Sequence, residues 1–246
     1  MKNRRILISQ SKPTDVNSIY FKLAEKHELE ISFKPFFSIE PVDAKEFRQQ
    51  RISILEHTAV IFSSKNSIDY FFKICQQLKL EIPKEMKYFC IMEPVANYLQ
   101  KYILLRKRKI FVGQGNLTGL FDLFLKHREE KYLVISSQNR KMEISGFFEE
   151  NSIDYSEAAL FNVSSNDLSG LELKDFGILV FFSPADVKSL FDNFPTYEQN
   201  ETLIACFGPT TVITAKGAGL KVSIEAPIPQ ALSMSSAIEL YMKNSN

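Results

Sequence analysis

The chain contains little of what marks disulfide-rich or metal-binding proteins. Its 246 residues include no tryptophan, three cysteines and three histidines. Cys75, Cys90 and Cys206 are odd in number and widely spaced, which excludes a paired-ligand motif, and we expect them to be buried thiols. No two histidines have the spacing of a metal site on a helix. We therefore expect neither a metal nor a disulfide framework.

The chain also lacks an excess of either charge and any long apolar run. Lys and Arg total 30 against 29 Asp and Glu, a net charge of +1 that gives no electrostatic case for nucleic acid. The one basic cluster, Arg106 to Lys109, is expected on an exposed turn. No segment approaches the roughly 20 apolar residues that span a bilayer. The N-terminal sequence MKNRRILISQ has no signal-peptide pattern. We expect a cytoplasmic protein that binds neither membrane nor nucleic acid.

A strand-to-helix turn occurs twice, about 120 residues apart. In each copy a buried-looking apolar run ends in a small hydroxyl residue, and an amphipathic helix pattern follows: AVIFSSKNSIDYFF at 59–72 and ILVFFSPADVKSLF at 178–191. Ser64 aligns with Ser183, and Phe72 aligns with Phe191. A second strand and turn follow each copy, KYFCIMEPVANYL at 87–99 and LIACFGPTTVITA at 203–215. This repetition predicts two similar domains with a ligand-binding cleft between them.

Apolar runs alternate with helical patterns along the whole chain, including a helix expected over 43–55. Strands separated by helices of ten or more residues are typical of βαβ units, so the fold class is α/β with parallel sheets flanked by helices. The two most extended segments lie near 33–41 and 160–167. If they pair as a two-stranded linker, residues 38–162 form a domain inserted into one built from 1–34 and 168–246.

The turns supply the candidate binding residues. In open parallel sheets, ligands bind at the carboxyl ends of strands, where helix N-termini carry unpaired N–H groups that attract anions. These considerations select Ser63, Ser64, Ser183, Thr210, Thr211 and the backbone amide of Gly208. The alternative is that the hydroxyl residues only cap helices. Several such turns around one cleft favour a ligand with many carboxylates or phosphates.

Other catalytic motifs are missing or incomplete. Gly113-Gln-Gly115 follows a strand, but Gly119 stands one residue too late for a dinucleotide fingerprint. There is no Walker lysine motif or nucleophile elbow. Glu129 and Glu130 are expected to be solvated residues at a helix end.

Three segments resemble the uroporphyrinogen-III synthase family. They are ACFGPTTVITAKGAGLKVSIEAPIPQAL at 205–232, FFSPADVKSLF at 181–191 and IFSSKNSIDYFF at 61–72. The resemblance implies two α/β domains joined by a two-stranded ladder, with the middle of the chain forming one domain. It also implies a monomeric, cofactor-free enzyme that closes hydroxymethylbilane into a macrocycle, losing water and inverting ring D. This substrate carries eight carboxylates, and a transient handover from hydroxymethylbilane synthase is expected.

The sequence departs from the family pattern at three positions. Phe161 stands at the apparent position of a family tyrosine implicated in leaving-group departure, so the catalytic proton donor is unknown, with Tyr155 and Tyr197 as substitutes. Met92 and Val95 replace the usual glycine and threonine of the inserted domain. These departures sustain an alternative, a catalytically degenerate protein that binds a tetrapyrrole or other polycarboxylate without turnover. A two-domain sensor is a third hypothesis, but no output module is visible.

Overall fold

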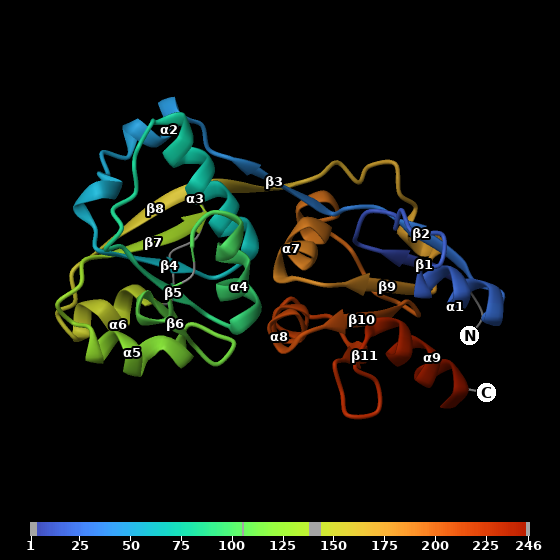
Figure 1. The fold of residues 1–246 in the computed structure, drawn as a ribbon. Coiled ribbons are helices and arrows are strands. Elements are labelled where there is room, and N and C mark those ends of the chain that lie inside the picture. Colours follow the sequence, from blue (N-terminus) through green and yellow to red (C-terminus); the bar gives the residue numbers. More distant parts are fainter. Residues whose placement is uncertain (1–3, 105, 138–143, 245–246) are drawn as a thin grey trace. The chain divides into compact units, whose positions relative to one another are not determined.

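The computed structural model describes residues 4–104, 106–137 and 144–244 (Figure 1). The chain divides into two compact units. The discontinuous unit consists of Met1–Ser38 and Ser164–Asn246, and the inserted unit consists of Ile39–Val163. The chain therefore passes from one unit to the other twice. Among the described residues, no helix has the length and apolar character needed to cross a membrane.

The discontinuous unit is built on a five-stranded, wholly parallel sheet of order β11-β10-β9-β1-β2. Its strands are β1 (Arg5–Ile8), β2 (Glu30–Phe33), β9 (Ile178–Phe181), β10 (Leu203–Phe207) and β11 (Val222–Ala226). Its helices are α1 (Ile19–His27), α7 (Pro184–Asn193), α8 (Pro209–Gly217) and α9 (Met234–Asn244), with a 3-10 turn η5 (Leu173–Asp175).

Alternate residues of this sheet enter two separate cores. Leu179 and Phe181 of β9 pack in the cluster that includes residues of α7 and α8. Ile178 and Val180 pack in the cluster that includes residues of α1 and α9. Because both faces are covered, all four residues are apolar, as is usual in parallel sheets.

The inserted unit has a six-stranded sheet of order β3-β8-β7-β4-β5-β6. Its strands are β3 (Phe37–Pro41), β4 (Ala59–Phe62), β5 (Lys87–Cys90), β6 (Ile110–Val112), β7 (Tyr132–Ser137) and β8 (Tyr155–Ser165). Strands β4 to β8 pair in parallel. The Val42 amide donates to the Leu160 carbonyl at 2.9 Å, and the Asn166 amide donates to the Phe36 carbonyl at 2.8 Å. The residue numbers of the paired positions increase along one strand and decrease along the other, so β3 runs antiparallel to β8.

The helices of the inserted unit cover both faces of its sheet. They are α2 (Ala44–Gln49), α3 (Lys65–Gln77), α4 (Glu93–Tyr98), α5 (Phe121–Lys126) and α6 (Ile144–Glu150). The 3-10 turns are η1 (Ile54–Glu56), η2 (Leu99–Lys101), η3 (Lys107–Lys109) and η4 (Thr118–Leu120). The helix expected over 43–55 is shorter than predicted. Helix α2 ends at Gln49, and Arg51 has a positive φ of 56°, which an α-helix cannot accommodate.

Candidate functional site

The strand order creates one switch point in each sheet. In the discontinuous unit β1 and β9 are neighbours, while β2 lies beyond β1 and β10 lies beyond β9. In the inserted unit β4 and β7 are neighbours, with β5 beyond β4 and β8 beyond β7. Ligands of open α/β sheets bind at the carboxyl ends of the two strands at such a point. The predicted residues Ser63 and Ser64 directly follow β4, and Ser183 lies two residues after β9.

In the inserted unit, Ser64 is the N-cap of α3. Its hydroxyl accepts from the Ser67 amide at 3.1 Å, and its own amide donates to the Ser67 hydroxyl at 3.1 Å. This reciprocal capping box leaves the amides of Lys65 and Asn66 without an acceptor among the described residues. Ser63 is half-buried beside them. The turn after β4 therefore presents free N–H donors at the N-terminus of a helix.

Lys65 adds a positive charge to this turn, which sequence reasoning missed. Its ammonium lies 5.6 Å from the centroid of the Tyr98 ring, and it has no carboxylate partner among the residues described. The neighbouring Lys101 differs, because its ammonium pairs with Asp69 at 2.9 Å. Lys65 thus remains available to an anion that reaches the α3 N-terminus.

In the discontinuous unit, Ser183 caps α7 in the equivalent way, but a carboxylate takes the place of the second hydroxyl. Oδ2 of Asp186 accepts from the amides of Phe182 at 2.9 Å and Ser183 at 2.8 Å, and from the Ser183 hydroxyl at 3.1 Å. Pro184 has no N–H at the first helical position. Ser183 is therefore engaged with the chain itself.

Asp186 is buried, with 1% of its surface exposed. Burial raises its carboxyl pKa, against the opposing effect of hydrogen bonds from Phe182, Ser183 and Ser9. Oδ1 of Asp186 and the hydroxyl of Ser9 are both buried without a well-formed hydrogen bond. Sequence reasoning missed this residue because an acid at the third helical position is an ordinary helix-start feature.

The turn after β10 is also open to an anion. Gly208, the N-cap of α8, has φ 85° and donates its amide to the Ala226 carbonyl at 2.6 Å. We predicted that this amide donates to a ligand, but it is already engaged by the chain itself. Pro209 occupies the first helical position, and the amides of Thr210 and Thr211 have no acceptor in the described chain.

The two threonines of this turn differ in exposure. Thr210 is exposed, whereas Thr211 is 0% exposed and its hydroxyl is buried without a hydrogen-bond partner. A buried, unpaired hydroxyl is costly, and the Thr211 hydroxyl therefore remains a donor that no group of the described chain satisfies.

The corresponding turn of the inserted unit, after β5, offers less to an anion. Met92 is the N-cap of α4 and makes no side-chain cap, Glu93 brings a negative charge, and Pro94 lacks an N–H. Val95 stands at the same third helical position as Thr211 and is buried. The buried hydroxyl of Thr211 thus has an apolar counterpart here.

Phe161 lies in the carboxyl-terminal half of β8, where it is opposite Ser137 of β7. Its ring is 5.4 Å from the Tyr70 ring. Tyr155 begins β8 and donates its hydroxyl to Glu149 at 3.1 Å, so it lies at the opposite end of the strand. Tyr197 lines a cavity with Gly177 and Leu203, at the starts of β9 and β10. Neither tyrosine lies at the carboxyl ends of the strands, where the turns are. Tyr70, which the sequence analysis did not identify, lies on α3.

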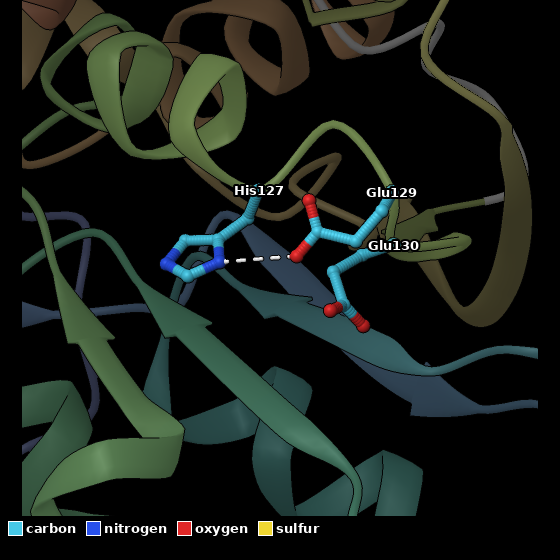
Figure 2. Close-up of side chains that lie close together, drawn as sticks. All are labelled: His127, Glu129 and Glu130. Atoms are coloured by element: carbon cyan, nitrogen blue, oxygen red, sulfur yellow. Dashed lines mark ion pairs between the residues drawn. The ribbon is translucent and has the colours of Figure 1, made fainter.

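The structure also brings together His127, Glu129 and Glu130, whose ligand atoms lie within 4.8 Å of one another (Figure 2). Nδ1 of His127 is 3.5 Å from Glu129. The Lys87 ammonium lies 2.5 Å from Glu130 and 3.7 Å from Glu129, so both carboxylates already have a cationic partner. Glu130 is buried, which corrects the expectation that both acids are solvated. The burial is tolerated because the carboxylate is ion-paired.

Comparisons with known proteins identify one family. The family model for uroporphyrinogen-III synthase HemD matches residues 20–236. A mutant uroporphyrinogen III synthase from the extremely thermophilic bacterium Thermus thermophilus has a similar structure, with a TM-score of 0.68, 14% identity and coverage of 98% of this chain and 99% of that chain. The uroporphyrinogen-III synthetase from Helicobacter pylori gives a TM-score of 0.59, 17% identity and coverage of 98% and 99%. No curated protein matches the chain at a significant level. At these identities the structures show a common fold, and none of the comparisons favours a degenerate, non-catalytic relative.

Proposed function

The chain belongs to the uroporphyrinogen-III synthase family, and we propose that it binds carboxylates of hydroxymethylbilane at the helix N-termini that follow β4 and β10. The family's enzymes are cyclising lyases of tetrapyrrole biosynthesis. They close hydroxymethylbilane into uroporphyrinogen III with loss of water and inversion of ring D.

The observation that carries this proposal is the N-terminus of α8. Two free backbone amides, those of Thr210 and Thr211, stand beside a buried hydroxyl with no partner. These are the donors that a carboxylate accepts from, and the positive end of the helix dipole favours the same charge. Gly208 contributes by conformation, since its missing Cβ lets a ligand approach the backbone closely.

The turn after β4 supplies a second subsite of the same kind. Its donors are the amides of Lys65 and Asn66, with the Lys65 ammonium and the hydroxyls of Ser63 and Ser64 beside them. Ser183 belonged to the predicted set, but we leave it outside the binding residues because its hydroxyl donates to Asp186.

The reaction needs positioning more than acid–base chemistry. Loss of the hydroxyl from the ring A methylene leaves an azafulvene cation, which the pyrrole nitrogen stabilises. Ring D attacks through its already substituted carbon, giving a spiro intermediate that fragments and recloses with ring D inverted. Holding the two ends in this geometry can contribute several kcal/mol without a catalytic dyad.

The departing hydroxyl still benefits from a proton donor. Phe161 cannot donate a hydrogen bond, whereas Tyr70 places a phenol against the Phe161 ring. Burial raises the pKa of Tyr70, so its hydroxyl keeps its proton at neutral pH. We assign this assistance to Tyr70.

The remaining features of the proposal concern the protein in the cell. The two compact units are its two domains, the protein acts as a cytoplasmic monomer, and it takes the bilane from hydroxymethylbilane synthase. A handover of this kind is favoured because the free bilane cyclises spontaneously to the type I isomer.

The test is an isomer analysis. Hydroxymethylbilane is generated in situ in the presence of the protein, the product is oxidised, and the uroporphyrin isomers are separated by chromatography. We expect predominantly type III. Type I alone, formed at the uncatalysed rate, would overturn the synthase assignment for this chain.

A further inference from the structure

The two repeated turns, after β4 and after β9, share a backbone motif but differ in charge. In each, the N-cap serine forms a reciprocal capping box with the third residue of the helix. That third residue is Ser67 in α3 and Asp186 in α7, and both are buried, at 0% and 1% exposure. The same motif therefore contains a neutral hydroxyl in the inserted unit and a carboxylate in the discontinuous unit.

The Asp186 carboxylate already makes the contacts that a bound carboxylate would make. Its Oδ2 accepts from two backbone amides and one hydroxyl, those of Phe182 and Ser183, at 2.8–3.1 Å. A helix N-terminus favours a negative charge in this position. The amides of Phe182 and Ser183 and the Ser183 hydroxyl are consequently satisfied by an acid of the chain itself, whereas the Ala185 amide has no acceptor among the described residues.

This turn lies at the switch point of its sheet, where open α/β proteins usually bind ligands. Ser9, which follows β1 at the same point, is buried, and its hydroxyl has no well-formed hydrogen bond. The second carboxylate oxygen, Oδ1 of Asp186, likewise has no well-formed hydrogen bond. No cation within the described ranges forms an ion pair with Asp186, so its charge opposes a second anion.

We propose that Asp186 excludes the substrate's carboxylates from the turn after β9, so that the two repeated turns bind unequally. The turn after β4 accepts a carboxylate, and the turn after β9 does not. Asp186 is then a specificity-determining residue that acts by occupying amides and by charge. This inference rests on the proposed function, because it concerns the same substrate.

Reciprocal variants test it. Asp186→Ser gives α7 the residue that α3 has at the equivalent position, and Ser67→Asp does the reverse. Asp186→Asn removes the charge but keeps an acceptor for the amides. The dissociation constant of uroporphyrin III, an octacarboxylate, is measured for each by fluorescence titration, with thermal unfolding as a check that the variants fold.

We expect Asp186→Ser to tighten binding about two- to fivefold and Ser67→Asp to weaken it by a similar factor, the range typical of a charge at a helix N-terminus. Asp186→Asn should tighten binding by no more than Asp186→Ser. A folded Asp186→Ser variant whose affinity is unchanged or weaker would overturn the proposal.

A measurement on the unaltered protein does not depend on how the variants fold. Uroporphyrin III is titrated into labelled protein, and the backbone amide resonances are followed by NMR. We expect large shifts for Lys65, Asn66, Thr210 and Thr211, and shifts no larger than the background for Phe182 and Ser183. A Ser183 shift comparable to that of Thr211 overturns the inference alone. If no turn responds, both the inference and the proposed binding sites fail, while the isomer analysis judges the synthase reaction separately.

Discussion

The ring of Tyr70 packs against the ring of Phe161, with centroids 5.4 Å apart and planes inclined by 31°. Tyr70 lies on α3, one turn beyond the predicted binding turn, and Phe161 lies toward the carboxyl end of β8. A phenol thus stands beside a position where the resemblance led us to expect one in the strand.

Replacing Tyr70 by Phe removes that phenol and keeps the ring contact. If Tyr70 assists departure of the hydroxyl, kcat for type III formation should fall by roughly a hundredfold, the lower range for general acid catalysis. Steady-state kinetics with hydroxymethylbilane measure this. Tyr155→Phe, at the other end of β8, is the control and should leave kcat unchanged.

The double variant Tyr70→Phe/Phe161→Tyr returns a phenol to the strand, and we expect it to recover part of the lost kcat. A Tyr70→Phe enzyme with the kcat of the unaltered protein would rule out this role.

Thr211→Val removes a buried hydroxyl that has no hydrogen-bond partner. An unpaired buried hydroxyl costs about 1–3 kcal/mol, so the substitution should leave the free energy of unfolding unchanged or raise it. Activity should nevertheless fall, with kcat/KM reduced about tenfold or more, because a hydrogen bond to a charged group is lost.

The matched control is Thr214→Val on the same helix, where the hydroxyl donates to the Thr210 carbonyl at 2.9 Å. We expect its kcat/KM to be unchanged. Equal losses in both variants would show that α8, and not the Thr211 hydroxyl, is being perturbed.

Gly208→Ala tests the conformation at the start of α8. Gly208 has φ 85° and ψ 146°, a region that residues with a Cβ rarely adopt. A Cβ there would meet no atom within 4 Å, so backbone strain is the expected cost, about 1–3 kcal/mol of unfolding free energy. Urea denaturation measures it. Gly217→Ala, in the same helix with open space around it, should not show this loss.

Asp186 predicts a pH dependence of stability. Burial raises its pKa in the folded protein above the unfolded value, so the folded state binds the proton more tightly. The stabilisation from this proton is present below the unfolded pKa and is lost as pH rises through the folded pKa. The nearby Cys206 thiol stays neutral over this range, because burial raises its pKa to about 12.

In Asp186→Asn this titration is absent. The unfolding free energy of the unaltered protein, measured relative to Asp186→Asn, should therefore fall as pH rises above about 4, the usual pKa of an aspartate in an unfolded chain. Urea denaturation of both proteins across this range provides the comparison. A difference that grows as pH rises would contradict the assigned direction of the pKa shift.

Much of the fold could be predicted from the sequence because both sheets are buried on two faces. Strands such as Ile178–Phe181 appear as continuous apolar runs, and the serine that caps the following helix marks the turn. Element ends were less certain. Helix α2 stops at Gln49 because of the backbone conformation at Arg51, which the apolar pattern does not reveal.

The candidate site could be predicted by position but not by bonding. The sequence left open whether Ser64 and Ser183 bind a ligand or only cap helices, and both are helix N-caps. It did not reveal that the Gly208 amide donates to Ala226. These two residues are separated in sequence by all of α8, and they become adjacent only when β11 pairs with β10.

By itself, the sequence determined the α/β class, the repeated turn and the family, since these follow from local periodicity and from motifs read along one chain. Only the tertiary structure decided which donors remain free. Hydrogen bonds join residues distant in sequence, and the burial that leaves Thr211 unpaired and encloses Asp186 is a property of the packed units. Two turns with nearly the same sequence motif therefore differ in which donors they leave free.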